Sequence, residues 1–225
     1  MPRPTSTHRL ARLLALAWLL VCSAAAAQAL DAAAPGQRLQ GLLGTAAQAP
    51  PAEVIRLAAQ VVASGDARGR AYAVIDKRAA RLWVFGPSGQ PLADSPVLVG
   101  QATGDVAPPD IGTRPLRQVR AHEKITPAGR FDTEPGENLR GEDIVWLDYD
   151  SALSLHRVRD VPGEGRPARI GANDARRRRI SYGCVNVPAG FYDRHIQPWF
   201  ARQAGVVYIL PETLPLARVF GFAPD

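Results

Sequence analysis

The pattern of hydrophobic and polar positions changes from a helical to a strand period near residue 70. In PPAEVIRLAAQVVASG, Val54, Ala58, Val61 and Val62 recur at helical spacing between a proline start and a glycine stop. This pattern predicts a short amphipathic helix that packs on a larger domain. YAVID and RLWVF follow, two runs rich in β-branched and aromatic residues and joined by a charged turn, and they predict a β-hairpin.

Further apolar runs predict additional strands. PLADSPVLVG follows the hairpin, DIVWLDYD leads into SALSLHRV, and VVYIL comes near the end of the chain. Residues 101–143 hold many Gly and Pro residues, and no repeat period divides the chain. We therefore expect one mainly β domain with few helices. A helix predicted to begin near Pro188 would place Cys184 in a turn before a helix N-terminus, where the helix dipole favours a thiolate.

The first residues have the pattern of a secretory signal peptide. Three arginines precede an apolar run from Leu13, and a small-residue exit, Ala27-Gln28-Ala29, predicts cleavage before Leu30. The run to Ala27 is shorter than the roughly 20 residues of a membrane-spanning helix, so an uncleaved anchor is the weaker reading. We expect residues 1–29 to be a signal peptide, 30–69 a flexible leader with the short helix, and 70–225 the main domain of a protein exported to the periplasm or cell envelope.

Cleavage would change both the charge and the cysteine content. Loss of three arginines from 27 basic residues leaves 24 against 21 acidic residues, a net charge of +3, and this near-neutral balance argues against nucleic-acid binding. Cys22 is also lost, so Cys184 becomes the only cysteine. An odd cysteine in an exported protein pairs between chains, is buried and inert, or is reactive.

A reactive cysteine needs a base, and three histidines remain as candidates. His156 ends a predicted strand, where its side chain can face a cleft, whereas His195 lies in the predicted helix and His122 in a polar loop. No C-x-x-C or H-x-x-x-H spacing supplies a metal site, so we expect no metal. The alternatives without catalysis are that Cys184 is a buried structural residue and that His156 is a core residue whose hydrogen bonds are made within the protein.

SYGCVN resembles the signature of the L,D-transpeptidases, also called the YkuD domain, in which a Ser-x-Gly-Cys core follows an upstream histidine. IDKRAARLWVFGPSGQPLADSPVLVG resembles the opening hairpin and third strand of that family, and TPAGRF resembles its TP-x-G-x-F turn. The resemblance covers roughly residues 70–211 and implies a β-sandwich whose nucleophile lies in a turn before a helix.

The resemblance implies a role for each matching residue. Cys184 would be the nucleophile, His156 its base, and the carbonyl of Arg157 the group that orients the imidazole. The backbone N–H groups around Tyr182, Gly183 and Cys184 would form an oxyanion site. Ser181 and Asn186 would shape the turn and the substrate groove, and Gly183 would allow close approach because it lacks a Cβ.

The implied reaction is acyl transfer on peptidoglycan. Cys184 would attack the third residue of a tetrapeptide stem, expel the terminal D-alanine and pass the acyl group to an amine, without a cofactor. A second stem as acceptor gives a cross-link, a lipoprotein lysine gives an anchored protein, and water gives a carboxypeptidase or amidase. The alternative from another class is a peptidoglycan-binding protein that has lost turnover. In either case we expect a monomer.

Two features depart from the family pattern. Tyr182 stands where the family usually has histidine, which affects how substrate is oriented. His156 and Cys184 are 28 positions apart, more than is usual, and the extra residues are polar and basic, which predicts an insertion over the groove. The arginines of this insertion are Arg166, Arg169 and the run that ends in Arg179. They would either bind carboxylates of the substrate or lie in a solvated loop without a binding role.

Overall fold

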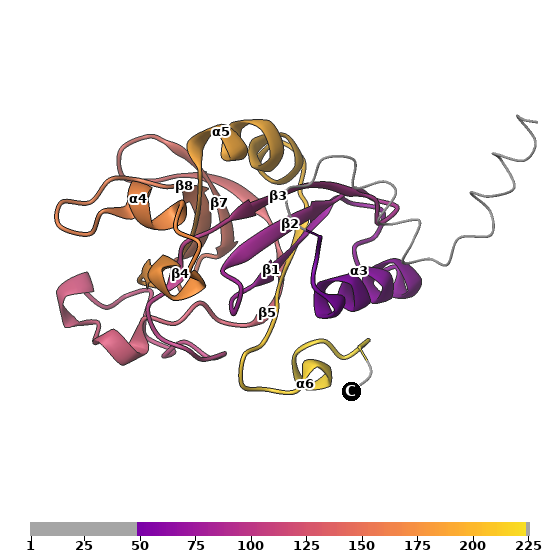
Figure 1. The fold of residues 1–225 in the computed structure, drawn as a ribbon, viewed down its shortest axis with the longest axis horizontal. Helices are drawn as coiled ribbons and strands as arrows, with labels where there is room; N and C mark the ends of the chain where they lie inside the picture. Colours follow the sequence, from indigo (N-terminus) through magenta and orange to yellow (C-terminus); the bar gives the residue numbers. More distant parts are fainter. Residues whose placement is uncertain (1–48, 224–225) are drawn as a thin grey trace, which may run out of the picture. The chain divides into compact units, whose positions relative to one another are not determined.

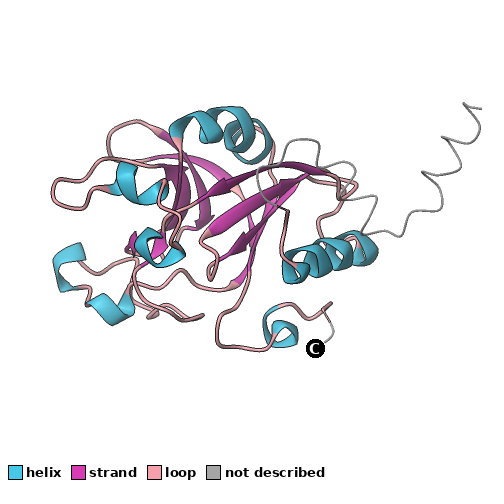
Figure 2. Ribbon diagram, viewed as in Figure 1, coloured by secondary structure: helices cyan, strands magenta, loops and turns pink. Residues whose placement is uncertain are grey.

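The protein is described from a computed structural model, in which the structure describes residues 49–223. The predicted signal peptide and the leader up to residue 48 lie outside these residues. Among the residues described, no helix is long and apolar enough to cross a membrane. Strands fill the centre and short helices surround them (Figure 2), so the predicted mainly β domain with few helices is confirmed.

The larger sheet has five strands in the order β3-β2-β1-β11-β5. The predicted hairpin forms its middle, with β1 (Tyr72–Asp76) antiparallel to β2 (Arg81–Phe85). On the other side of β1 lies β11 (Val206–Ile209), which runs parallel to it. The edges are β3 (Pro91–Pro96) and β5 (Gly129–Asp132). The strand predicted near the end of the chain is thus central to the sheet.

The second sheet has four strands in the order β10-β8-β7-β6. The strands β6 (Glu134–Glu137), β7 (Asp143–Asp148) and β8 (Leu153–Arg157) form an antiparallel meander. The short strand β10 (Val185–Val187) then pairs with β8 in parallel. This one parallel pairing joins segments about thirty residues apart in the chain.

The main hydrophobic core lies between the two sheets. Because side chains alternate across a strand, each strand of the larger sheet sends one set of residues inward. Ala73 and Ile75 of β1 face Val145 and Leu155 of the second sheet within one buried cluster. The helical segment after β10, α5 (Ala189–Phe191) continued by the π-helix η4 (Tyr192–Ala201), closes this core with aromatic and aliphatic side chains.

The other set of side chains is covered by helices. Tyr72, Val74 and Tyr208 pack in a second cluster with one face of α3 (Ala52–Ser64), the predicted amphipathic helix. The hydroxyl of Tyr72 donates a hydrogen bond of 3.1 Å to the carbonyl of Ala58. The last helix, α6 (Leu216–Val219), lies along the same side of the sheet (Figure 1). Helix α3 therefore packs on the domain, as the sequence predicts.

The turn that carries Cys184 lies between two short strands. Before it, β9 (Arg179–Ser181) pairs with β4 (Val99–Gly100), and after it comes β10. The helix predicted near Pro188 is present, but the three residues of β10, roughly 10 Å of extended chain, separate it from Cys184. A helix dipole acts mainly within the first turn, so the expected dipole effect on the thiol is wrong.

Short helices occupy the two long connections. The segment between β4 and β5 contains η1 (Leu116–Gln118) and η2 (Ala121–Glu123). The basic segment between β8 and β9 forms α4 (Arg166–Ile170) and η3 (Ala175–Arg178). Polar residues with interspersed Gly and Pro gave no helical period here, so neither pair of helices was predicted.

A buried ion pair holds the first of these segments against the hairpin. Lys77 is fully buried, and its ammonium donates hydrogen bonds to Asp105 Oδ1 at 2.7 Å, Gly104 O at 2.5 Å and Thr126 O at 2.9 Å. Asp105 in turn accepts backbone N–H bonds from Glu212 and from the two residues after it. The charge of Lys77 is therefore compensated and all three of its donors are used.

The carboxylate of Asp105 is strongly stabilised in its charged form. Burial alone would raise its pKa, but the hydrogen bonds from Lys77, the Thr213 hydroxyl and backbone N–H groups outweigh that, and its pKa lies well below the ordinary value. A depressed carboxyl pKa stabilises the fold above the ordinary value of 3.8 and loses this effect as the pH falls below it.

We predict that Asp105→Ala lowers the free energy of unfolding by roughly 3–5 kcal/mol, because it removes the carboxylate hydrogen-bonded to the buried ammonium of Lys77 and leaves Glu212, at 3.8 Å, as the remaining acidic partner. Urea unfolding at neutral pH measures the loss. The double variant Lys77→Met/Asp105→Leu removes both charges and should recover part of it, because the backbone N–H groups that donate to Asp105 still lose their acceptor. A loss below about 1 kcal/mol in the single variant, in the range of an exposed pair, would show that the pair is not an important support.

Candidate active site

The parallel pairing of β10 with β8 brings the predicted site residues together. The register places Asn186 beside His156, with Val185 beside Leu155. Val185 and Leu155 point into the core, so Asn186 and His156 face outward from the second sheet. Cys184 and Ser154 lie two residues earlier on the same face and are in contact through Sγ and Oγ at 3.5 Å. A thiol, a hydroxyl, an imidazole and an amide thus form one cluster.

The Cys184 thiol is half-buried and touches polar groups from the β7–β8 turn. Its Sγ donates to the carbonyl of Ala152 at 3.3 Å, and the Ser154 hydroxyl donates to Sγ. Ala152 has φ of 52°, a left-handed conformation that a residue with a Cβ rarely adopts. Strained backbone therefore lies next to the thiol, as is common at functional sites.

The surroundings of Cys184 favour its thiolate. Burial raises the pKa of the thiol, but a hydrogen bond and the charge of His156, together with the Ser154 hydroxyl and N–H, more than compensate, so the pKa falls from 9.0 to about 7. At neutral pH a large share of the protein would therefore carry a nucleophilic sulfur.

The imidazole of His156 is held from its other side by backbone. Its Nδ1 lies 2.8 Å from the carbonyl oxygen of Arg157, the group that the family resemblance implies. The guanidinium of Arg157 forms ion pairs at 2.7 Å with Asp143 and Asp193, and it stacks on the Tyr192 ring, 4.1 Å from the centroid. The side chain of Arg157 thereby fixes the peptide whose carbonyl contacts the imidazole.

Asn186 links the imidazole to the segment between β8 and β9. Its Nδ2 lies 3.3 Å from His156 Nε2 and 3.3 Å from the carbonyl of Cys184. Its Oδ1 accepts a bond of 3.0 Å from Arg166 Nη1. The amide is fully buried, so each of these contacts compensates for lost hydration.

Ser181 and Gly183 determine the shape of the turn around Cys184. The Ser181 hydroxyl donates to the Cys184 carbonyl at 2.7 Å and accepts the Gly183 N–H at 3.1 Å. Gly183 has φ of 142°, and a Cβ there would lie 2.8 Å from the carbonyl oxygen of Ile125. Glycine is required on both counts.

The predicted oxyanion site is only partly available in this conformation. The Gly183 N–H is occupied by Ser181 Oγ. The N–H groups of Tyr182 and Cys184 make no hydrogen bond within residues 49–223 and are available to a ligand oxygen. The oxyanion role stays a prediction for these two groups.

Two hollows meet at Cys184. A groove of about 680 Å³ crosses the outer face of the second sheet, and Ile144, Trp146, Ser154, His156 and Cys184 line it together with exposed side chains such as Leu139 and Tyr149. On the other side of the sulfur lies an apolar pocket of about 90 Å³. Tyr182 lines this pocket, and the ammonium of Lys124 lies 3.9 Å above its ring.

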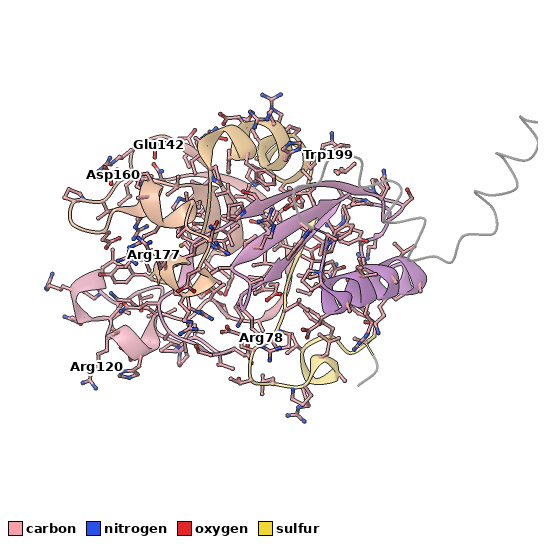
Figure 3. The ribbon with its side chains drawn as sticks, in the orientation of Figure 1. Arg78, Arg120, Glu142, Asp160, Arg177 and Trp199 are labelled. Atoms are coloured by element: carbon pink, nitrogen blue, oxygen red, sulfur yellow. The ribbon has the colours of Figure 1, made fainter. Side chains whose placement is uncertain are left out.

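The predicted substrate-binding arginines have partners inside the protein. Arg166 contacts Glu164 and Asn186, Arg169 donates to the Glu164 and Arg177 carbonyls, and Arg179 pairs with Glu212. From the basic segment, only Arg159 lines the groove. Arg177, labelled in Figure 3, is exposed. The segment thus packs beside β10 instead of covering the groove, and binding of substrate by these arginines stays a prediction.

The structure adds residues that the sequence did not single out. Ser154, Trp146 and Arg159 line the groove beside His156. Ser154 lies two residues before His156 on the same strand, so the alternation of side chains along a strand is a signal that could have identified it. Trp146 pairs with Ser154 across β7 and β8 and therefore lies on the same face. Of the other candidate bases, His122 is exposed in η2, and His195 packs on Phe191 with ring centroids 5.0 Å apart.

Comparison with known proteins gives likenesses in structure alone. No family model matches the chain, and no curated protein sequence matches it. Among solved structures, the catalytic domain of an E. faecium L,D-transpeptidase is 16% identical, with a TM-score of 0.34 over 63% of this chain and 98% of that one. An L,D-transpeptidase from Mycobacterium smegmatis is 15% identical, with a TM-score of 0.33 over 63% of this chain and 58% of that one.

A third similar structure is a fused Zn-dependent amidase/peptidase/peptidoglycan-binding domain-containing protein from Clostridium acetobutylicum. It is 14% identical, with a TM-score of 0.37 over 72% of this chain and 64% of that one. This chain therefore spans less than two thirds of the M. smegmatis and C. acetobutylicum chains.

We predict that alkylation of Cys184 by iodoacetamide follows a pH profile with a midpoint near 7 in the wild-type chain. His156→Ala should move the midpoint upward, because burial then acts on the thiol without its main compensation. Ser154→Ala should cause a smaller upward shift. The measurement is the mass of the peptide that carries Cys184, and a wild-type midpoint at the ordinary thiol value would contradict the prediction.

Proposed function

We propose that this chain is an exported cysteine L,D-transpeptidase that forms a thioester with peptidoglycan tetrapeptide stems. The observation that carries the proposal is that a thiol of lowered pKa and an imidazole lie on the same face of two paired strands and line one open groove, with the imidazole Nδ1 held by a backbone carbonyl. This is the arrangement of an activated cysteine nucleophile. The motifs around Cys184 and Thr126 direct the proposal to peptidoglycan.

Acylation would use Cys184 and His156 in turn. His156 Nε2 takes the thiol proton, and Sγ attacks the carbonyl carbon of the third stem residue. The N–H groups of Cys184 and Tyr182 stabilise the oxyanion of the tetrahedral intermediate. His156 Nε2–H then protonates the amine of the terminal D-alanine, which leaves as the carbon–nitrogen bond breaks and the thioester remains.

Deacylation would reverse the proton transfers with a different amine. The acceptor amine attacks the thioester carbonyl, Nε2 takes its proton, and the thiol leaves with a proton restored. A second stem gives a cross-link between stems, and a lipoprotein lysine gives an anchored lipoprotein. Water as acceptor makes the same acyl-enzyme a carboxypeptidase or amidase.

The shape of the groove supports a polymer-bound substrate. It is open along the outer face of the sheet, and its volume of about 680 Å³ is within the range of sites for peptides and small molecules. Exposed Leu139 and Tyr149 and half-buried Trp146 give it apolar walls, while Glu137 and Arg159 provide charges of both signs for a stem that carries amines and carboxylates.

We predict that the protein converts disaccharide tetrapeptides and that Cys184→Ala abolishes conversion, because the thioester cannot form. The products are read by mass: free D-alanine with a cross-linked dimer for transfer, or with a tripeptide for hydrolysis. The matched control Ser88→Ala lies on the β2–β3 turn, away from the groove, and should keep full conversion.

Intact mass after exposure to a carbapenem provides a second readout, because the activated ring acylates such a cysteine directly. An adduct on Cys184 without conversion of tetrapeptides would move the proposal to another acyl substrate. A folded protein with neither adduct nor conversion would favour a wall-binding protein and would overturn the enzyme.

A further inference from the structure

Arg166 connects the basic segment to the reacting pair without reaching the groove. It is the first residue of α4, and 10% of its side chain is exposed. Its Nε donates to Glu164 Oε2 at 2.5 Å and its Nη1 donates to Asn186 Oδ1 at 3.0 Å. The groove-lining residues do not include Arg166. Its guanidinium therefore makes its hydrogen bonds within the protein.

The guanidinium determines which way the Asn186 amide points. An arginine can only donate hydrogen bonds, so the amide atom that faces it must be the oxygen. The nitrogen then points to His156 Nε2 and to the Cys184 carbonyl, each at 3.3 Å. A rotated amide would place Nδ2 against the guanidinium and Oδ1 against the Cys184 carbonyl. Both contacts would be repulsive.

The amide orientation in turn determines where the imidazole carries its proton. The Arg157 carbonyl accepts only, so Nδ1 carries a proton. Nε2 faces the Asn186 N–H and is left with a lone pair. Protonation of Nε2 would set one N–H against another, which disfavours the imidazolium.

We propose that Arg166 is a positioning residue that locks the Asn186 amide and so favours, for neutral His156, the tautomer with its proton on Nδ1 and its lone pair on Nε2. By this contact the lock opposes the pairing of an imidazolium with the Cys184 thiolate. The inference deepens the proposed function and rests on it for the identity of the reacting pair.

Other charged groups also face the imidazole, and they are present both in the wild-type chain and in an Arg166 variant. Besides Cys184, the groups that line hollows together with His156 come from β6, β7, the loop between these strands, and the end of β8: Glu137, Glu142, Asp143, Arg157 and Arg159. Glu142 is labelled in Figure 3, at the edge of the molecule. None of them is changed by substitution of Arg166, and the effect of losing the Arg166 charge itself is measured separately in the Asn186→Ala background.

We predict that Arg166→Met shifts the iodoacetamide profile of Cys184 to lower pH by about half to one unit, the equivalent of one neutral hydrogen bond. The released amide no longer opposes the imidazolium, so the ion pair forms at lower pH. The shift should be absent when Arg166→Met is added to Asn186→Ala, because the amide is the link. Arg81→Met is the matched control: Arg81 is similarly buried, pairs with Asp94 at the edge of the larger sheet, and should leave the profile unchanged.

An unchanged profile in Arg166→Met would overturn the inference, and so would an equal shift in the Asn186→Ala background. If Arg166→Met does not fold, Arg166→Gln retains an N–H donor for Asn186 Oδ1 and should keep the wild-type profile. Nitrogen NMR of the wild-type imidazole tests the tautomer directly: a proton on Nε2 while Cys184 is still a thiol would refute it. No readout uses substrate, so a shift in a chain that leaves tetrapeptides untouched would sink the proposed function alone.

Discussion

The parallel pairing of β10 with β8 is the constraint on which the site depends. A thiol and an imidazole 28 positions apart become neighbours because Asn186 is in register with His156. A slip of one residue would turn every side chain of β10 to the opposite face and bury Cys184 and Asn186 in the core. The apolar residues Val185 and Val187 oppose such a slip, since they fill the space between the sheets. The hydrophobic core therefore specifies the geometry of the polar cluster on the other face.

Around that register, the imidazole is positioned by groups that do not react. The Arg157 carbonyl, fixed by ion pairs to β7 and η4, holds Nδ1, and Asn186, fixed by α4, faces Nε2. Ser181 holds the turn from below. Each support comes from a different element, so the ring is defined from several directions while the sulfur stays accessible from the groove.

The sequence predicts the strands well where the pattern is strongly apolar. YAVID, RLWVF, DIVWLDYD and VVYIL each form a strand, because β-branched and aromatic residues suit positions buried on one or both faces. The sequence pattern predicts no strand at VNV, because three residues carry too little period to be recognised as one. The helices of the basic segment were missed because Gly, Pro and arginine dominate there.

Part of the site can also be predicted from the sequence, and part of it cannot. A lone thiol and a histidine at a strand end can be recognised from local residues and motifs, and the structure brings Cys184 and His156 together. The partners of Arg166 could not be predicted, since they depend on how a loop without periodicity packs against β10. From the sequence, an arginine can be taken as available to bind an anion. Its burial and the hydrogen bonds that its N–H groups already make in the fold determine whether it can do so.

The contact between Gly183 and the segment before β5 makes the two sides of the sulfur mechanically unequal. Thr126 Oγ1 donates to the Gly183 carbonyl at 2.6 Å, and the Thr126 carbonyl accepts from buried Lys77. Ile125 and Gly183 of the apolar pocket thus belong to the hydrogen-bonded frame of the nucleophile, whereas one wall of the groove comes from the exposed turn around Leu139. A ligand group in the apolar pocket would therefore meet residues bonded to the turn of the nucleophile, and a group in the groove would meet a separate, exposed turn.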